Sequence, residues 1–148
     1  MNVDLTDRVA LVTGAARGIG QAIADRLADN GARVVYTDVD AAGVEESASR
    51  SDDAAAMVMD VRDESQVAAV IADVASRFGR IDILVNNAGV NTLQHRVTID
   101  QFPRDEWNRI IDVDLTGLYV VSRVVAGRMR EQRWGRIINI ASVVGLVP

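Results

Sequence analysis

The fold of this chain is decided by Thr13-Gly14-Ala15-Ala16-Arg17-Gly18-Ile19-Gly20, which follows an apolar run at residues 9–12 and opens a helical pattern. In such a turn the backbone N–H groups of the helix start point at an anion, and the helix dipole favours that anion. We expect Gly14 to permit the tight turn, Gly18 to let the backbone approach phosphates, and Gly20 to let the helix pack closely on the strand. The stretch therefore predicts a phosphate site, with a simple turn before a tightly packed helix as the alternative.

Strand-like and helix-like segments alternate along the rest of the chain. Mostly continuous apolar runs, typical of parallel strands covered on both faces, predict strands at residues 8–13, 33–37, 55–59, 81–85 and 136–140. Helical patterns cover residues 18–30, 42–49, 64–77 and 104–132, and Asp63 with Gln66 resembles a capping pair for the third helix. The alternation predicts an α/β fold with a doubly wound parallel sheet. A length of 148 residues corresponds to about one domain, so residues 1–148 are expected to form a single domain. The predicted phosphate site in the glycine turn makes this domain a candidate dinucleotide-binding unit.

Composition argues against several classes of protein. The chain has 16 Lys and Arg against 21 Asp and Glu, a net charge of −5, and no basic run, so no nucleic-acid partner is expected. It has no cysteine, and His95, expected to be a surface loop residue, is its single histidine, so no metal site built on these residues is expected. The acidic N-terminus and the lack of an apolar stretch near 18 residues predict a cytoplasmic protein without a membrane partner.

Two charged residues bear on the choice of nucleotide. Asp38 ends the second predicted strand, where a carboxylate can accept hydrogen bonds from both ribose hydroxyls of an adenosine and repels a 2′-phosphate. Asp38 therefore predicts NAD over NADP, with a turn or helix-cap role as the alternative. Arg17 favours the opposite choice, since a cation in the turn could meet a 2′-phosphate. We give Asp38 more weight because it stands where the ribose is expected.

Polar and small residues follow the third and fourth predicted strands. Asp60 is expected to bind the amino group of an adenine and the N–H of Val61 a ring nitrogen, unless Asp60 caps the third helix. Asn86-Asn87-Ala88-Gly89 opens the longest irregular stretch, residues 86–102, at the sheet edge where open α/β folds bind ligands. Its two amides can tie strand ends together while contacting a ribose, although turns rich in asparagine are common.

Two further residues are candidates for catalysis. Asp114 falls on an apolar stripe formed by Trp107, Ile111, Leu118 and Val125. Burying a carboxylate costs free energy, so such a residue is expected either to serve a functional site or to pair with a backbone donor. Gly117 would let the helix approach a neighbour. Ser142 follows the fifth predicted strand, where its hydroxyl could bond a substrate carbonyl or alcohol, unless it caps a turn.

Taken together, these residues resemble the short-chain dehydrogenase/reductase family along the whole chain and in order. The resemblance implies a Rossmann fold and an NAD(P)-dependent oxidoreductase that moves a hydride between a nicotinamide and a small-molecule carbonyl or alcohol. It also implies a homo-oligomer, a dimer or tetramer when complete. It places catalytic roles on Ser142 and Asp114, and cofactor contacts on Gly14, Arg17, Gly18, Ile19, Gly20, Asp38, Asp60, Val61, Asn87, Ala88 and Gly89.

The chain departs from the family pattern in two places. The family usually has Asn at the position of Asp114, where the backbone holds a water of a proton relay. Its general acid/base is a Tyr followed four residues later by a Lys, on a helix about a dozen residues after the serine, and no such pair occurs before Pro148. We therefore expect an N-terminal part of a longer fold that by itself has little activity. The alternative is a non-catalytic dinucleotide-binding module.

Overall fold

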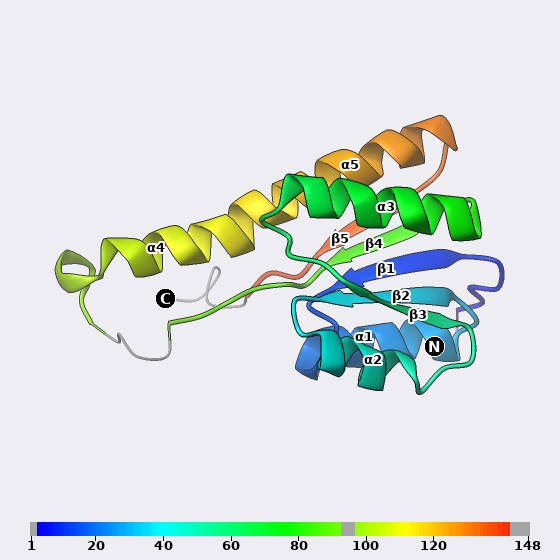
Figure 1. The fold of residues 1–148 in the computed structure, drawn as a ribbon, viewed down its shortest axis with the longest axis horizontal. Coiled ribbons are helices and arrows are strands. Elements are labelled where there is room, and N and C mark those ends of the chain that lie inside the picture. Colours follow the sequence, from blue (N-terminus) through cyan, green and yellow to red (C-terminus); the bar gives the residue numbers. More distant parts are fainter. Residues whose placement is uncertain (1–2, 93–96, 143–148) are drawn as a thin grey trace.

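The computed structural model describes residues 3–92 and 97–142, which form a central sheet between two layers of helices (Figure 1). Five strands, all paired in parallel, lie in the order β3-β2-β1-β4-β5. They are β1 (Val9–Thr13), β2 (Arg33–Asp38), β3 (Ala54–Val58), β4 (Ile83–Asn86) and β5 (Arg136–Asn139). The chain reverses its winding direction between β1 and β4. The predicted doubly wound α/β fold is confirmed.

Helices cover both faces of this sheet. One face carries α1 (Gly18–Asp29) and α2 (Ala41–Ala48), and the other carries α3 (Glu64–Phe78) and α5 (Leu118–Glu131) (Figure 1). Successive residues of each strand point to opposite faces, so the core is split into two apolar clusters. Val12 and Tyr36 belong to the cluster beneath α1 and α2, whereas Leu11 and Val35 belong to the one beneath α3 and α5. The inner strands therefore need apolar residues at nearly every position.

At the start of α3, one half of the predicted capping pair is present. The Asp63 carboxylate accepts hydrogen bonds from the N–H groups of Ser65, at 2.9 Å, and Gln66, at 3.0 Å. The Gln66 side chain does not return to Asp63 but accepts the N–H of Asp60. Asp63 is therefore the cap, and the alternative that Asp60 caps this helix is wrong. At the other end Gly79 adopts a φ of +75°, a left-handed conformation that ends the helix.

The fourth predicted helix is continuous but changes its pitch. It begins as α4 (Arg104–Ile111), widens into a π-helical segment (Asp112–Gly117) and continues as α5. A short 3₁₀ turn (Ile99–Gln101) precedes it. Figure 1 shows α5 lying over the sheet while α4 extends past the carboxyl edge of the strands. Within this long helix, α4 has no buried residue and the π-helical segment has one, Gly117, whereas α5 buries a face through Val120, Val121, Val125 and Met129.

The predicted buried stripe around Asp114 is wrong. Asp114 is exposed, and the Trp107 side chain is 47% exposed. The stripe assumed a uniform turn of 3.6 residues, but the wider π turn rotates the side chains that follow it. In addition, no residue of α4 is buried.

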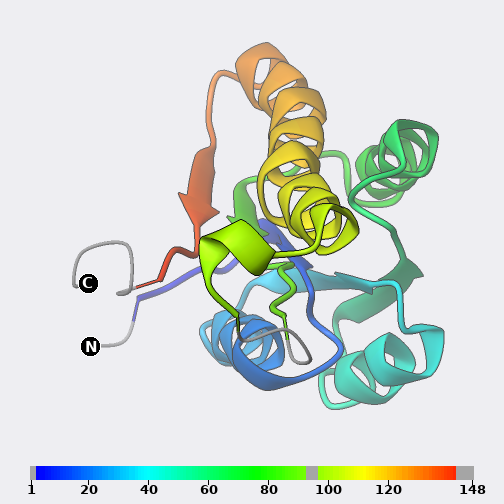
Figure 2. The same cartoon turned by 90° about the vertical axis from the view of Figure 1, so that its left-hand side faces the viewer.

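One edge of the sheet exposes apolar side chains. β5 is the outer strand next to β4 (Figure 2). Ile137 and Ile138 on this strand and Ile140 just after it are 38–47% exposed. Such apolar exposure is a general consequence of an outer strand that has no further neighbour. None of the described helices is long and apolar enough to cross a membrane.

At the amino edge of the strands, a buried carboxylate joins β1 to β4. Asp82 is fully buried and accepts hydrogen bonds from the Val9 N–H at 3.0 Å and from Arg80 at 2.6 and 2.7 Å. Burial favours the neutral acid, but the bonds from Arg80 and Val9 outweigh it and hold the pKa of Asp82 below its usual value. This ion pair therefore stabilises the sheet at the edge opposite the candidate site.

Candidate functional site

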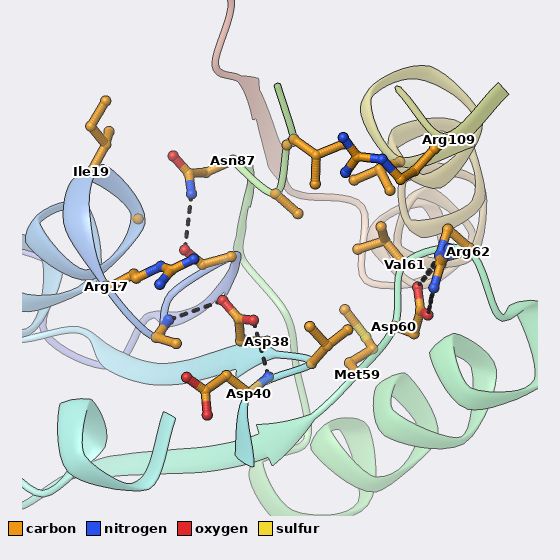
Figure 3. A pocket seen from close by; sticks show the side chains of 18 residues that line it. Arg17, Ile19, Asp38, Asp40, Met59, Asp60, Val61, Arg62, Asn87 and Arg109 are labelled. Atoms are coloured by element: carbon orange, nitrogen blue, oxygen red, sulfur yellow. Dashed lines mark hydrogen bonds and ion pairs between the residues drawn. The ribbon is translucent and has the colours of Figure 1, made fainter. Parts of the chain in front are cut away.

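A cavity of about 530 Å³ lies at the carboxyl edge of the sheet, around the ends of β1, β2, β3 and β4 (Figure 3). This is the place where the winding of the sheet reverses, and open α/β sheets bind ligands there. Ten of the eleven residues predicted to hold a cofactor line it; the exception is Gly18, although its neighbours Arg17 and Ile19 do. The cavity also has lining residues that were not predicted from the sequence: Ala16, Val39, Asp40, Met59, Arg62, Val90, Arg109 and Val113.

The glycine turn has the conformation that its sequence requires. Gly14 and Gly18 have φ of +67° and +61°, in the left-handed region that favours glycine. A methyl group on Gly20 would overlap the carbonyl oxygen of Gly14 and the Asn87 side chain, so this glycine permits close packing. Apart from its chain neighbours and its own helix backbone, no described residue has an atom within 4 Å of the position that a Cβ on Gly18 would take.

The start of α1 is left open by its own residues. Its N-cap residue, Arg17, makes no side-chain capping bond, and the first turn contains no acidic residue. The first N–H groups of a helix have no partner within the helix, so they favour an anion close to the helix start. The turn therefore has the geometry of an anion site.

Thr13 and Asn87 fasten the end of β1 to the end of β4. The Thr13 hydroxyl accepts the N–H groups of Asn87 and Ala88, each at 3.0 Å. The Asn87 side chain donates to the carbonyls of Thr13 and Gly14, each at 3.1 Å. The predicted tie between strand ends is thus present at Asn87. The hydrogen bonds of Thr13 were not predicted. The one feature of the sequence that indicates them is a polar residue at the end of an apolar strand.

Asn86 makes a second tie, on the other side of β4. It is buried, and its amide nitrogen donates to the Ser122 hydroxyl at 2.8 Å and to the Asn139 side chain at 2.9 Å. These bonds join β4 to α5 and to the end of β5. Ser142 follows β5 by three residues, is exposed and does not line the cavity.

Asp38 is held by the backbone around it. Its carboxylate accepts the Ala16 N–H at 3.2 Å and the Asp40 N–H at 3.1 Å (Figure 3). The carbonyl of Ala16 in turn accepts the hydroxyl of the buried Ser47 at 3.0 Å. Asp38 thus has the turn role proposed as its alternative and also lines the cavity. Asp40, not Asp38, caps α2, through the Gly43 N–H at 3.1 Å.

Some of the charged side chains around the cavity form ion pairs. Arg62 and Asp60 form a two-pronged ion pair with contacts of 2.7 and 3.0 Å, and the bonds from Arg62 hold the pKa of Asp60 below its usual value. Arg109 contacts Glu106 at 3.4 Å and the carbonyl of Asn91 at 3.2 Å. Arg17 makes no ion pair with a residue that the structure describes.

Asp114 has a backbone partner. Its carboxylate accepts the Val90 N–H at 2.8 Å, and Gly89 lies beside it, which fits the alternative that it pairs with a backbone donor. Asp114 does not line the cavity but holds the loop that does. Gly117 has the predicted close neighbour, since a Cβ there would lie 2.5 Å from the Val61 side chain. His95 lies outside the described residues.

Comparison with known proteins identifies the family. The family model for short chain dehydrogenases matches residues 8–148, so the chain belongs to this family. The oxidoreductase YxjF of Bacillus subtilis (strain 168), described as uncharacterized, is 46% identical over 144 residues, covering 95% of this chain and 55% of that protein. The 3-oxoacyl-(acyl-carrier-protein) reductase FabG of Vibrio cholerae serotype O1 is 39% identical over 144 residues, covering 97% and 58%.

Solved structures agree with this assignment. The crystal structure of gox2181 matches with a TM-score of 0.93 and 34% identity, over 97% of this chain and 57% of that one. A structure described as NAD⁺-bound xylitol dehydrogenase matches with a TM-score of 0.92 and 32% identity, over 98% and 56%. The chain thus spans a little over half the length of these relatives.

Proposed function

We propose that this chain is the dinucleotide-binding part of an NAD-dependent oxidoreductase acting on a small-molecule carbonyl or alcohol. The observation that carries the proposal is the cavity at the β1–β4 reversal, lined by ten of the eleven residues predicted to hold a cofactor. Family membership and the oxidoreductase relatives support the reaction class.

The residues around the cavity fit a dinucleotide. The open start of α1 suits the pyrophosphate, because its N–H groups have no capping side chain. On the side of the cavity away from the turn, the side chains of Met59 and Val61 form an apolar wall that suits a flat base (Figure 3). Asp38 lies between the turn and this wall, where the adenosine ribose would come. The volume of about 530 Å³ is within the usual range for a bound small molecule.

Each group of residues then has a physical task. The turn from Gly14 to Gly20 holds the pyrophosphate, and Asn87, Ala88 and Gly89 flank the second ribose. Ser142 orients the substrate oxygen and stabilises the charge that develops on it. Asp114 keeps the loop of Gly89 in place through Val90. When bound, the nicotinamide supplies the hydride donor or acceptor.

The preference for NAD rests on Asp38. Its carboxylate is oriented by two backbone N–H groups before any ligand arrives, so little entropy is lost when it accepts ribose hydroxyls. A 2′-phosphate at the same place would meet a fixed negative charge. The relative described as NAD⁺-bound xylitol dehydrogenase is consistent with this choice.

Isothermal titration calorimetry with NAD and NADP on Asp38→Asn and Asp40→Asn tests the proposal. Each change removes one negative charge from the same cavity, but Asp40 is engaged in capping α2 and Asn preserves a cap. We expect the wild type to prefer NAD. Asp38→Asn should lower NAD affinity by about 10-fold to 100-fold, the range for hydrogen bonds to a charged group, and narrow the gap to NADP.

Asp40→Asn should change the NAD to NADP ratio by less than about twofold, because only the general field of the cavity changes. Equal effects of the two variants would contradict specific ribose recognition by Asp38. Failure of the wild type to bind either dinucleotide would refute the proposed function.

A further inference from the structure

We propose that Arg62 binds the adenine end of the dinucleotide, with the flat face of its guanidinium lying against the purine ring. The inference rests on the proposed function and adds a binding residue to it. The structure supports it through the way Arg62 is anchored, where it stands in the cavity, and how its charge is balanced.

Arg62 is held at several points by one neighbour. Its Nε donates to Asp60 Oδ1 at 3.0 Å, its Nη2 to Asp60 Oδ2 at 2.7 Å, and its backbone N–H also to Asp60 Oδ1 at 2.9 Å. A two-pronged pair of this kind fixes the plane of the guanidinium as well as its position. Although the side chain is 51% exposed, it therefore has little freedom left to lose when a ligand binds.

Arg62 stands at the base end of the cavity. Figure 3 shows it with Met59, Asp60 and Val61 on one side of the cavity, while Arg17, Ile19 and Asn87 lie on the opposite side, near the glycine turn. An arginine that served the phosphates would be expected beside that turn. Arg62 instead borders the apolar wall, where a planar base would be enclosed.

The charge of Arg62 is already balanced. Asp60 carries the opposite charge of the ion pair, and the carboxylate of Asp112, on the π-helical segment, also acts on Arg62. Arg62 is therefore a poor site for an anion. Its bonds to Asp60 lie in the plane of the guanidinium and do not use the two flat faces of the group. Such faces stack on aromatic rings and nucleobases.

The same pair alters the role expected for Asp60. An ionised carboxylate has about four acceptor sites, and bonds from Arg62 occupy most of them. Asp60 thus acts mainly as a positioning residue for Arg62. Recognition of the adenine then depends on stacking more than on a hydrogen bond from its amino group to Asp60.

Calorimetric titration of AMP, NAD and nicotinamide mononucleotide into four proteins tests this assignment. They are the wild type, Arg62→Ala, Arg62→Lys and Arg123→Ala. Arg62→Lys keeps the charge and a bond to Asp60 but loses the planar face. Arg123 is a matched control, because it is also 51% exposed and pairs with one carboxylate, Glu64, at 2.7 Å, away from the cavity.

We expect both Arg62 variants to bind AMP and NAD about fivefold to tenfold more weakly, as for a cation stacked on a partly desolvated ring. Nicotinamide mononucleotide, which lacks adenine, should bind within about twofold of the wild type, and Arg123→Ala should change nothing. If either Arg62 variant binds AMP as tightly as the wild type does, the inference about Arg62 is overturned. An equal loss of affinity for all three ligands would overturn it too. In both cases the proposed function would stand. A wild type that binds neither NAD nor AMP overturns the proposed function together with it.

Discussion

Replacing Gly20 by alanine is expected to destabilise the fold, although alanine is the better helix former. Gly20 lies in the first turn of α1, against the glycine turn and the Asn87 side chain. A methyl group there would overlap the carbonyl oxygen of Gly14 and the amide nitrogen of Asn87. Because one of these atoms belongs to the backbone, the overlap cannot be relieved by turning a side chain.

The expected cost follows from the contacts that must move. Displacing the Asn87 amide weakens its two bonds to Thr13 and Gly14, each worth about 1 kcal/mol. Overpacking adds about 1–3 kcal/mol, and the higher helix propensity of alanine returns about 1 kcal/mol. The free energy of unfolding should therefore fall by about 2–4 kcal/mol. For a chain of this length, that corresponds to a Tm lower by roughly 10 °C.

Urea and thermal unfolding followed by circular dichroism measure this change. Gly127→Ala on α5 is the matched control, because no described residue outside the adjoining helix backbone has an atom within 4 Å of a Cβ at that position. It should stabilise the protein by about 0.5–1 kcal/mol. A Gly20→Ala protein within about 0.5 kcal/mol of the wild type would refute the packing argument. Equal shifts in the two variants would show that helix propensity alone governs both sites.

Two further predictions concern buried polar groups. Ser47→Ala should lower the free energy of unfolding in urea by about 1–3 kcal/mol, because the buried Ala16 carbonyl loses its donor. At the exposed Ser49, the change Ser49→Ala should lower it by less than about 0.5 kcal/mol. Equal losses in the two variants would contradict this reasoning. Asp82 has a pKa below its unfolded value near 3.9, so it stabilises the fold above that pH and loses this contribution as the pH falls through its folded value. Unfolding free energies measured between pH 2 and 6 should therefore depend on pH less steeply in Asp82→Asn than in the wild type, and parallel curves would exclude the ion pair as a cause.

The predictable part of the fold followed from burial. β1 and β2 lie inside the sheet with helices on both faces, so nearly every side chain must be apolar and the strands are visible as continuous runs. The predicted helices agree with α1, α2 and α3 to within a residue or two. The fourth helix was located correctly, but its buried face was not, because a π turn breaks the period on which that prediction depended.

The candidate site was largely predictable because of parallel topology. The carboxyl ends of parallel strands meet at one edge, so residues that end separate strands become neighbours whatever their distance in sequence. Asp38 and Asn87 were found in this way. Arg62 was not, because it lies beyond the end of β3, in the turn where it pairs with Asp60.

By itself, the sequence determined the succession of strands and helices along the chain and the strand ends that carry polar side chains. These are local properties, since apolar periodicity and turn glycines are set by residues near one another in the chain. The doubly wound sheet followed from that succession, because crossovers between parallel strands are right-handed. Only the tertiary structure decided the partners of those side chains, such as Ala16 for Asp38 and Val90 for Asp114. The reason is physical: a side chain can reach many polar groups in principle, and packing selects the one that lies within about 3 Å in a suitable direction.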